Sequence, residues 1–242
     1  MNGFIPMNLV ELSSAPRAGL RFQAQREREL DDALFALAAK LPGSRDGVAV
    51  CREFNGPRGI PDLLATTGYR RALETRELAG VPAITNLSES ALLATLPRNA
   101  PRSRSWIAET CGVSQRQADS RLRALRASGA VSQDGQAYSR NPAVQPIGHT
   151  YAFEAKVSDW GKGLTQALRY LSWADAAVIV LLDPPKDLSR VADQCRLHGI
   201  GLAFGDTWKV RPRLGRPTRG LRMAASEAWF RDFAHYRPSP DA

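Results

Sequence analysis

The sequence is poor in cysteine and has no long apolar run. Its 242 residues include three cysteines, Cys51, Cys111 and Cys195, which lie far apart and form no Cys-x-x-Cys pair. An odd number of isolated cysteines builds no disulfide framework and no cysteine-based metal site. No apolar run reaches the roughly 20 residues of a membrane-spanning helix. The first residues also lack the basic and apolar sections of a signal peptide. We therefore expect reduced thiols and a cytoplasmic location.

The sequence patterns of nucleotide-driven motors and of redox cofactors are also missing. There is no Gly-x-Gly-x-x-Gly pattern and no Walker loop. The three histidines, His149, His198 and His235, have no spacing typical of metal ligands, so we interpret each as a structural or surface residue. These absences direct attention to the charged residues.

Acidic residues are outnumbered by basic ones. Lys and Arg together number 33 against 24 Asp and Glu, a formal charge of +9. Between positions 97 and 140 there are eight arginines and three acidic residues, and between 207 and 222 there are six basic residues and none acidic. Clustered positive charge favours a polyanionic partner, nucleic acid above all. The alternative is a solvated, arginine-rich surface without a partner.

The N-terminal part has the pattern of a helix followed by two strands. Residues 1–20 show no periodicity, whereas apolar residues recur at helical spacing over 23–41, and Pro42-Gly43 ends that helix. Strands are predicted over 47–54 and 60–66, joined through the turn at 55–59, with Asp62 near the start of the second strand. A helix is predicted over 69–78.

The arginine-rich middle segment predicts three short helices and a hairpin. The helices are expected over 88–96, 102–110 and 115–128, with Trp106 and Ile107 turned inward and a capping box formed by Ser114 and Gln117. A hairpin turned at 133–135 follows. This order resembles a winged helix, whose third helix enters the major groove of duplex DNA. The resemblance implies that the outward side chains bind DNA, namely Arg102, Arg104, Gln115, Arg116, Ser120 and Arg123. A winged helix that contacts proteins is the alternative.

The segment 150–182 predicts a strand, a helix and a second, fully apolar strand. Side chains alternate along a strand, so Glu154 and Lys156 point to one face while Phe153, Ala155 and Val157 point into a core. On the helix, Lys162, Gln166 and Tyr170 share one stripe, and Leu164, Leu168 and Leu171 share the stripe that we expect to be buried. Beyond this unit we expect a helix over 188–198, a strand over 200–204 and a last helix over 224–236.

These pieces resemble the PD-(D/E)XK nuclease superfamily, which has the restriction-endonuclease-like fold. The matching residues are Pro61-Asp62, Glu154-Ala155-Lys156 and the Gln166-x-x-x-Tyr170 pattern of the recombination-nuclease-like branch. The resemblance implies an α/β fold, with a restriction-endonuclease-like core (a mixed central sheet flanked by helices) and an inserted small winged-helix domain. The expected parts are 1–82 and 143–242 for the nuclease core and 83–142 for the insert, which explains why Asp62 and Glu154 lie far apart in the sequence.

The resemblance also implies a reaction, the Mg²⁺-dependent hydrolysis of DNA phosphodiester bonds, with Mn²⁺ as a substitute. Asp62, Glu154 and the Ala155 carbonyl would hold the metal, Lys156 would position or deprotonate a water, and Gln166 and Tyr170 would support the site. A carboxylate on the first helix often adds a ligand in this superfamily. Glu27 and Glu29 are the candidates, ahead of Asp31 and Asp32, and Glu53 is another candidate member of the cleft.

Substrate and pathway stay open at this level. Lys162, Lys209, Arg211 and Arg213 are further candidates for DNA contacts, which adds a nucleoid-associated location to the expectation. The partner is expected to be double-stranded DNA and not a membrane, and a homodimer is compatible with the superfamily. Two alternatives are a DNA-binding regulator that has lost cleavage, and a structure-selective nuclease whose winged helix binds a partner or a junction.

Overall fold

The computed structural model describes residues 9–12, 30–97 and 100–235, and it is an α/β protein. The chain forms two compact units. The sheet unit comprises the residues up to Tyr69 together with Gly148–Pro217, and the helical unit comprises Arg70–Ile147 together with the residues from Thr218 onward. The expected insert, 83–142, lies within the helical unit, which also takes in 70–82, 143–147 and the last helix. Within the described residues, no helix is long and apolar enough to cross a membrane.

The sheet unit is built on a mixed seven-stranded sheet of order β1-β2-β3-β7-β8-β9-β10. Antiparallel pairing joins β2, β3 and β7, whereas β7, β8 and β9 run parallel, as do β1 and β2. The strands are β1 Leu9–Leu12, β2 Val48–Arg52, β3 Leu63–Thr67, β7 His149–Lys156, β8 Ala176–Leu181, β9 Gly201–Phe204 and β10 Thr207–Val210. β1 was not predicted from the sequence, because four residues carry too little periodicity.

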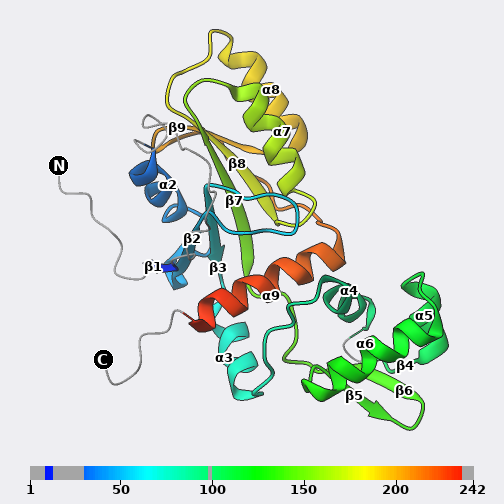
Figure 1. Cartoon of the computed structure of the whole chain (residues 1–242). Coiled ribbons are helices and arrows are strands. Elements are labelled where there is room, and N and C mark those ends of the chain that lie inside the picture. Colours follow the sequence, from blue (N-terminus) through cyan, green and yellow to red (C-terminus); the bar gives the residue numbers. More distant parts are fainter. Residues whose placement is uncertain (1–8, 13–29, 98–99, 236–242) are drawn as a thin grey trace, which may run out of the picture. The chain divides into compact units, whose positions relative to one another are not determined.

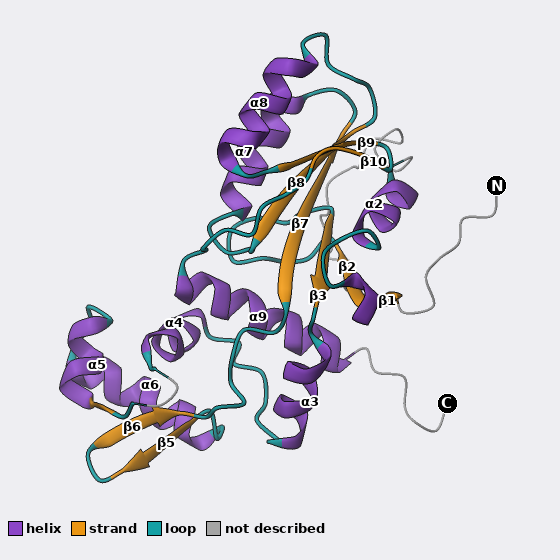
Figure 2. Cartoon of the chain, turned by 180° about the vertical axis from the view of Figure 1, so that it is seen from behind, coloured by secondary structure: helices purple, strands orange, loops and turns teal. Residues whose placement is uncertain are grey.

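Helices cover both faces of this sheet. Figures 1 and 2 show α2 (Asp31–Ala38) on one side and α7 (Trp160–Tyr170) with α8 (Leu188–His198) on the other. A 3₁₀ turn, Ser44–Asp46, leads into β2. Phe153 and Ala155 pack into the core beneath α2, as the alternation predicted. All six residues of β8 are buried, since a central strand covered on both faces requires a continuous apolar run.

The helical unit has its own core and its own small sheet. Its helices are α3 Arg70–Leu78, α4 Leu87–Thr95, α5 Arg104–Thr110, α6 Gln115–Ala127 and α9 Arg219–His235. β4 (Arg102–Ser103), β5 (Val131–Asp134) and β6 (Ala137–Arg140) form a three-stranded sheet of order β4-β6-β5. Inside the unit, Glu227 accepts hydrogen bonds from Arg76, at 3.1 and 2.8 Å, and from the Ile84 backbone N–H at 2.8 Å. Both side chains of this ion pair are at most 2% exposed.

Two predictions of side-chain direction were wrong. Trp106 is 36% exposed and its ring lies under the Arg102 guanidinium, 5.0 Å from the ring centroid, while Ile107 is fully buried as expected. None of the three leucines expected to be buried is so: Leu168 is 40% exposed, and Leu164 and Leu171 are half-buried. Helix α7 buries Gly163, Ala167 and Tyr170 instead, because small residues let its axis approach β7 and β8.

Candidate functional site

Asp62 lies where β3 begins, and its carboxylate reaches the neighbouring strand. The β3–β7 ladder starts with the pair Leu63–Phe153, so the N–H of Ala155 lies beyond the last backbone partner on that edge. Asp62 Oδ2 accepts a hydrogen bond from this N–H at 2.6 Å, across a sequence separation of 93 residues. Asp62 is thus the residue before β3 and not a member of it, and its side chain extends the ladder by one hydrogen bond.

Glu154 and Lys156 lie on the face of β7 that looks toward α7. The Glu154 side chain is 2% exposed and the Lys156 side chain 12%. Lys156 Nζ donates to Glu154 Oε1 at 2.5 Å and to the Ala155 carbonyl oxygen at 2.8 Å. A carboxylate so far from water requires a partner, and the ammonium provides it.

Tyr170 holds the second oxygen of Glu154. The buried hydroxyl lies 2.7 Å from Glu154 Oε2 and 3.0 Å from the Ile60 carbonyl oxygen, so its single proton is shared between two acceptors. Burial raises the pKa of Tyr170 strongly, and the negative charges of Glu154 and Asp62 raise it further. The hydroxyl therefore keeps its proton at any physiological pH and acts as a fixed donor.

Helix α7 brings Gln166 and Tyr170 to this face. Asp159 caps the helix by accepting from the Lys162 N–H at 3.0 Å. At Gly163 an added Cβ would lie 3.1 Å from Ile179 Cγ2 and 3.5 Å from Lys156 Cγ, so glycine sets the spacing between helix and sheet. Gln166 Oε1 is buried and has no hydrogen-bond partner among the described residues. Lys162 is exposed and does not belong to the cluster.

The donor atoms of this cluster fit a hard divalent cation. Asp62 Oδ2 bonds the Ala155 N–H, and Lys156 Nζ bonds both Glu154 Oε1 and the Ala155 carbonyl oxygen. An oxygen-only set of this kind suits Mg²⁺ or Mn²⁺. The Lys156 ammonium bonds two of these three groups, so a positive charge already lies beside them. The unpartnered Gln166 Oε1 adds one more oxygen without a donor. Across 30–97 and 100–235, however, no group of three or more His, Cys, Asp and Glu side chains gathers as a metal-binding cluster.

The remaining candidate carboxylates are placed as follows. Glu27 and Glu29 lie outside the described residues. Asp31 is ion-paired with Arg52, and Asp32 is exposed. Glu53 directly follows β2 and has a φ of 47°, a left-handed conformation that non-glycine residues seldom adopt.

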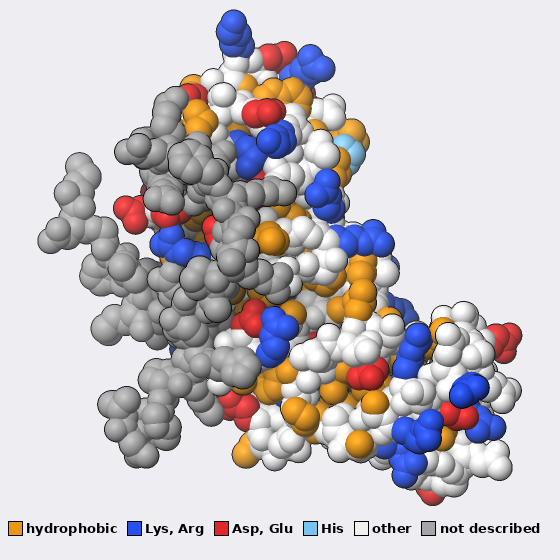
Figure 3. Space-filling view, in the orientation of Figure 1, with side chains coloured by type: hydrophobic (Ala, Val, Ile, Leu, Met, Phe, Trp, Pro, Cys, Tyr) orange, Lys and Arg blue, Asp and Glu red, His pale blue; other side chains and the backbone are white. Residues whose placement is uncertain are grey.

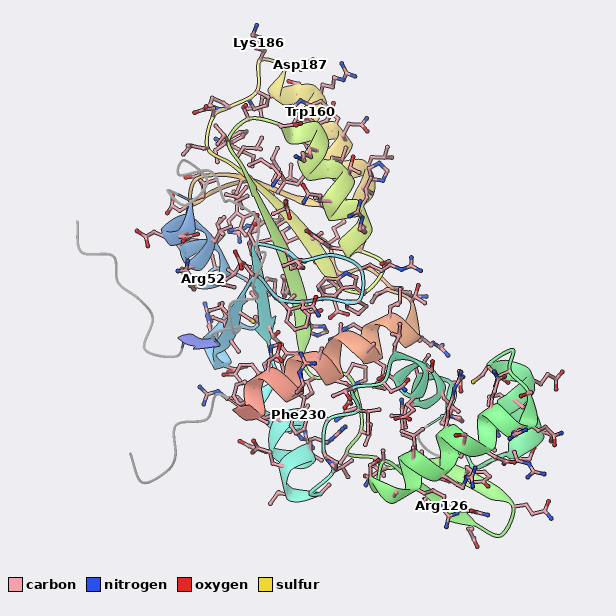
Figure 4. All side chains as sticks on the ribbon, viewed as in Figure 1. Arg52, Arg126, Trp160, Lys186, Asp187 and Phe230 are labelled. Atoms are coloured by element: carbon pink, nitrogen blue, oxygen red, sulfur yellow. The ribbon has the colours of Figure 1, made fainter. Side chains whose placement is uncertain are left out.

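The helical unit carries a groove lined by arginine. The structure shows the capping box of Ser114 and Gln117 at the start of α6, and this helix buries Ala118, Leu122 and Leu125. Beside its exposed face lies a groove of about 470 Å³. Its lining includes the predicted Arg104, Gln115, Arg116 and Arg123, together with Arg126 and Tyr138, which were not predicted as DNA contacts from the sequence. Figure 3 shows Lys and Arg side chains gathered over this part of the unit, and Figure 4 labels Arg126.

Some of the predicted DNA contacts already have partners within the protein, and others are exposed. Arg104 is ion-paired with Asp119 at 3.1 Å, Arg102 stacks on Trp106, and Ser120 is exposed on α6. In the sheet unit, Lys209 and Arg213 are exposed. Arg211 lies over the Trp208 ring and donates to the Lys40 carbonyl oxygen at 3.1 Å.

One residue of the cluster has no signal in the sequence. Trp173, just after α7, is fully buried and contacts the loop that carries Asp62. From the sequence, a single tryptophan is most simply interpreted as a core residue. Only its contacts in the folded protein connect Trp173 with the candidate site.

Comparison with known proteins adds no relative to this description: no family model matches the chain, and no curated protein and no solved structure matches it significantly.

Proposed function

We propose that the chain is a metal-dependent DNA endonuclease that hydrolyses phosphodiester bonds, with a restriction-endonuclease-like core in the sheet unit. The observation that carries the proposal is the hydrogen bond from the Ala155 N–H to Asp62 Oδ2 at 2.6 Å. It ties Asp62 to the backbone of the residue between Glu154 and Lys156, which lie in a distant part of the sequence. Two carboxylates beside a lysine form the minimal set that this chemistry requires.

Each residue has a role in the proposal. Asp62, Glu154 and the Ala155 carbonyl would hold Mg²⁺, with Mn²⁺ as a substitute. When bound, the metal would supply neutralisation of phosphate charge and a lower pKa for a water. Tyr170 keeps Glu154 oriented by donating a hydrogen bond to Oε2, while Gln166 supports the site from the same helix. Lys156 turns from the Ala155 carbonyl to donate to a phosphate oxygen or to the attacking water.

Duplex binding is assigned to the helical unit. We take α4, α5, α6 and the hairpin β5–β6 as a winged helix, with α6 as the helix that reads DNA. Support comes from the arginine-lined groove of about 470 Å³ beside α6. Arg116 and Arg123 contact phosphates or base edges, with Arg126 and Tyr138 at the same groove.

One observation favours a second candidate, a DNA-binding protein without cleavage. Lys156 Nζ already bonds Glu154 Oε1 and the Ala155 carbonyl, and such an ion pair can be structural. In this candidate, metal never displaces the ammonium.

A plasmid assay separates the two candidates. Supercoiled DNA is incubated with the native protein in Mg²⁺, in Mn²⁺ and in EDTA. We expect nicking or linearisation only with metal, and its loss in Asp62→Ala and Lys156→Ala. A matched control is Asp193→Asn, an exposed α8 carboxylate paired with Arg196, which retains full activity. Cleavage by the Asp62→Ala protein would refute the assigned site, and no cleavage by native protein would leave the second candidate.

A binding assay tests the helical unit separately. Each phosphate contact contributes about 0.9 to the slope of log K against log salt. The double variant Arg116→Ala/Arg123→Ala should therefore lower that slope by about 2. Arg70→Ala/Arg71→Ala, which removes two exposed arginines of α3, serves as the control and should change it little. An unchanged slope in the first variant would reject the assignment.

A further inference from the structure

The loop between β2 and β3 lies against the aromatic side chains at the end of α7. The Trp173 ring is fully buried, and its centroid lies 5.8 Å from that of Phe54 and 5.9 Å from that of Tyr170. Phe54 opens the loop and is itself fully buried. The loop is therefore attached to a rigid aromatic surface, although it is only a turn between two strands.

Three successive contacts tie the loop to this surface. At Gly56 the backbone lies so close to the indole that an added Cβ would be 2.5 Å from Trp173 Cζ2. Trp173 Nε1 donates to the Arg58 carbonyl oxygen at 3.3 Å, and the Tyr170 hydroxyl lies 3.0 Å from the Ile60 carbonyl oxygen. Contacts at every second residue leave the loop little freedom before it reaches Asp62.

Both ends of the loop are also constrained. Glu53, with its φ of 47°, donates its N–H to the Asp62 carbonyl oxygen at 3.0 Å, and Gly56 bridges to Gly59, whose φ is 101°. Left-handed residues persist only where their surroundings hold them in place. The Asp62 side chain extends from this constrained loop and accepts a hydrogen bond from the Ala155 N–H.

We propose that Trp173 and Gly56 form a positioning pair for Asp62. The indole fills the space that a side chain at position 56 would need, and its N–H donates a hydrogen bond to the loop backbone. The Asp62 carboxylate therefore stays hydrogen-bonded to the Ala155 N–H. The inference rests on the proposed function in one respect: the purpose of this placement is to preset one ligand of the metal. Holding a ligand in place before the metal arrives lowers the entropy lost on binding.

The Ala155 amide reports on Asp62 without any metal or substrate. Its N–H bonds the Asp62 carboxylate, so its hydrogen exchange, measured by NMR, accelerates when Asp62 moves. The Val180 amide of β8, in the same unit, serves as the internal reference for general destabilisation. In the Trp173→Phe protein we expect the Ala155 to Val180 exchange-rate ratio to rise at least fivefold. The matched control Trp160→Phe, at the other end of α7 (Figure 4), should leave the ratio unchanged.

Two further measurements separate positioning from packing. In an Asp62→Ala background, Trp173→Phe should add nothing to the ratio, since the bond is already lost. In the native background it should weaken Mn²⁺ binding, followed by electron paramagnetic resonance, about tenfold. Gly56→Ala should lower the opening free energy of the sheet unit, followed by β8 amide exchange, less in the Trp173→Phe background than in the native one, because phenylalanine lacks the ring atoms nearest to residue 56.

The outcomes are distinguishable from those of the proposed function. An equal exchange ratio in native and Trp173→Phe proteins overturns the inference, whether or not the protein binds metal. A raised ratio with unchanged Mn²⁺ affinity also overturns it, because Asp62 would then be positioned for something other than the metal. A native protein that neither binds Mn²⁺ nor cuts DNA refutes the proposed function and the stated purpose of the pair, while the exchange ratio still decides the contact between loop and indole.

Discussion

Replacing Tyr170 with phenylalanine removes one oxygen atom from the centre of the candidate site. The lost hydroxyl is the donor to Glu154 Oε2, at 2.7 Å, and it also lies 3.0 Å from the Ile60 carbonyl oxygen. Glu154 is 2% exposed, so water cannot replace the donor without rearrangement. The carboxylate keeps Lys156 as a partner for its other oxygen.

The expected cost follows from the charge of the acceptor. A hydrogen bond to a charged group contributes about 1.5–3 kcal/mol, against about 0.5–1.5 kcal/mol for one between neutral groups. The hydroxyl has one proton, so the two acceptors count once. We expect Tyr170→Phe to lower the opening free energy of the sheet unit by about 1.5–3 kcal/mol.

The matched control is Tyr151→Phe. Tyr151 lies on β7 and is 1% exposed, and its hydroxyl forms no hydrogen bond of normal geometry among the described residues. Both substitutions delete the same atom from a buried ring, so their difference reports the hydrogen bonding of the Tyr170 hydroxyl to Glu154 and Ile60. The control should cost less than about 0.5 kcal/mol.

Native-state hydrogen exchange of the β8 amides is the appropriate assay. The chain forms two compact units, so one unfolding free energy for the whole chain is not well defined. Exchange at β8 reports on the sheet unit alone. Equal losses in the two variants would refute the reasoning, because the hydrogen bonds of the Tyr170 hydroxyl would then contribute nothing beyond packing.

Two other predictions concern the packing and the buried charges. Arg76→Met leaves Glu227 unpaired inside the helical unit and should cost about 3–5 kcal/mol near pH 7, as measured from α9 amide exchange. Burial already raises the pKa of Glu227 and Arg76 opposes that rise, so the variant raises it further. A raised carboxyl pKa gives stability that is present at low pH and lost as the pH rises through the folded value. The deficit should therefore shrink as the pH falls toward about 4.3, the unfolded value, and a deficit independent of pH would contradict the assignment. Gly163→Val forces a branched side chain against Ile179, 3.1 Å from where a Cβ would lie, and should lower the opening free energy measured from β8 exchange by about 1–3 kcal/mol. The control, Leu168→Ala on the exposed face of α7, should lower it by less than about 0.5 kcal/mol. Similar costs in the two variants would show that α7 can move away from the sheet.

Local periodicity predicted most of the elements. The order of helix, strands, helix and strand around Asp62, Glu154 and Tyr170 appears in the structure, as do the capping box at Ser114 and the buried β8. These features depend on neighbours a few residues away, which the sequence displays directly. Strand alternation likewise placed Phe153 and Glu154 on opposite faces.

The sequence pattern did not predict which side of α7 is buried or which residues Asp62 contacts. The leucine stripe of α7 looked like the buried one, yet Gly163 and Ala167 allow the closer approach and Tyr170 finds a buried acceptor. Likewise, nothing near Trp173 in the sequence indicates that its N–H belongs to the loop at Arg58. The chain alone determined which segments become helices and strands, because that choice is made by short-range pattern. The tertiary structure decided that Asp62 meets Ala155 and that an indole holds its loop, because such contacts depend on the packing of segments that are distant in the sequence.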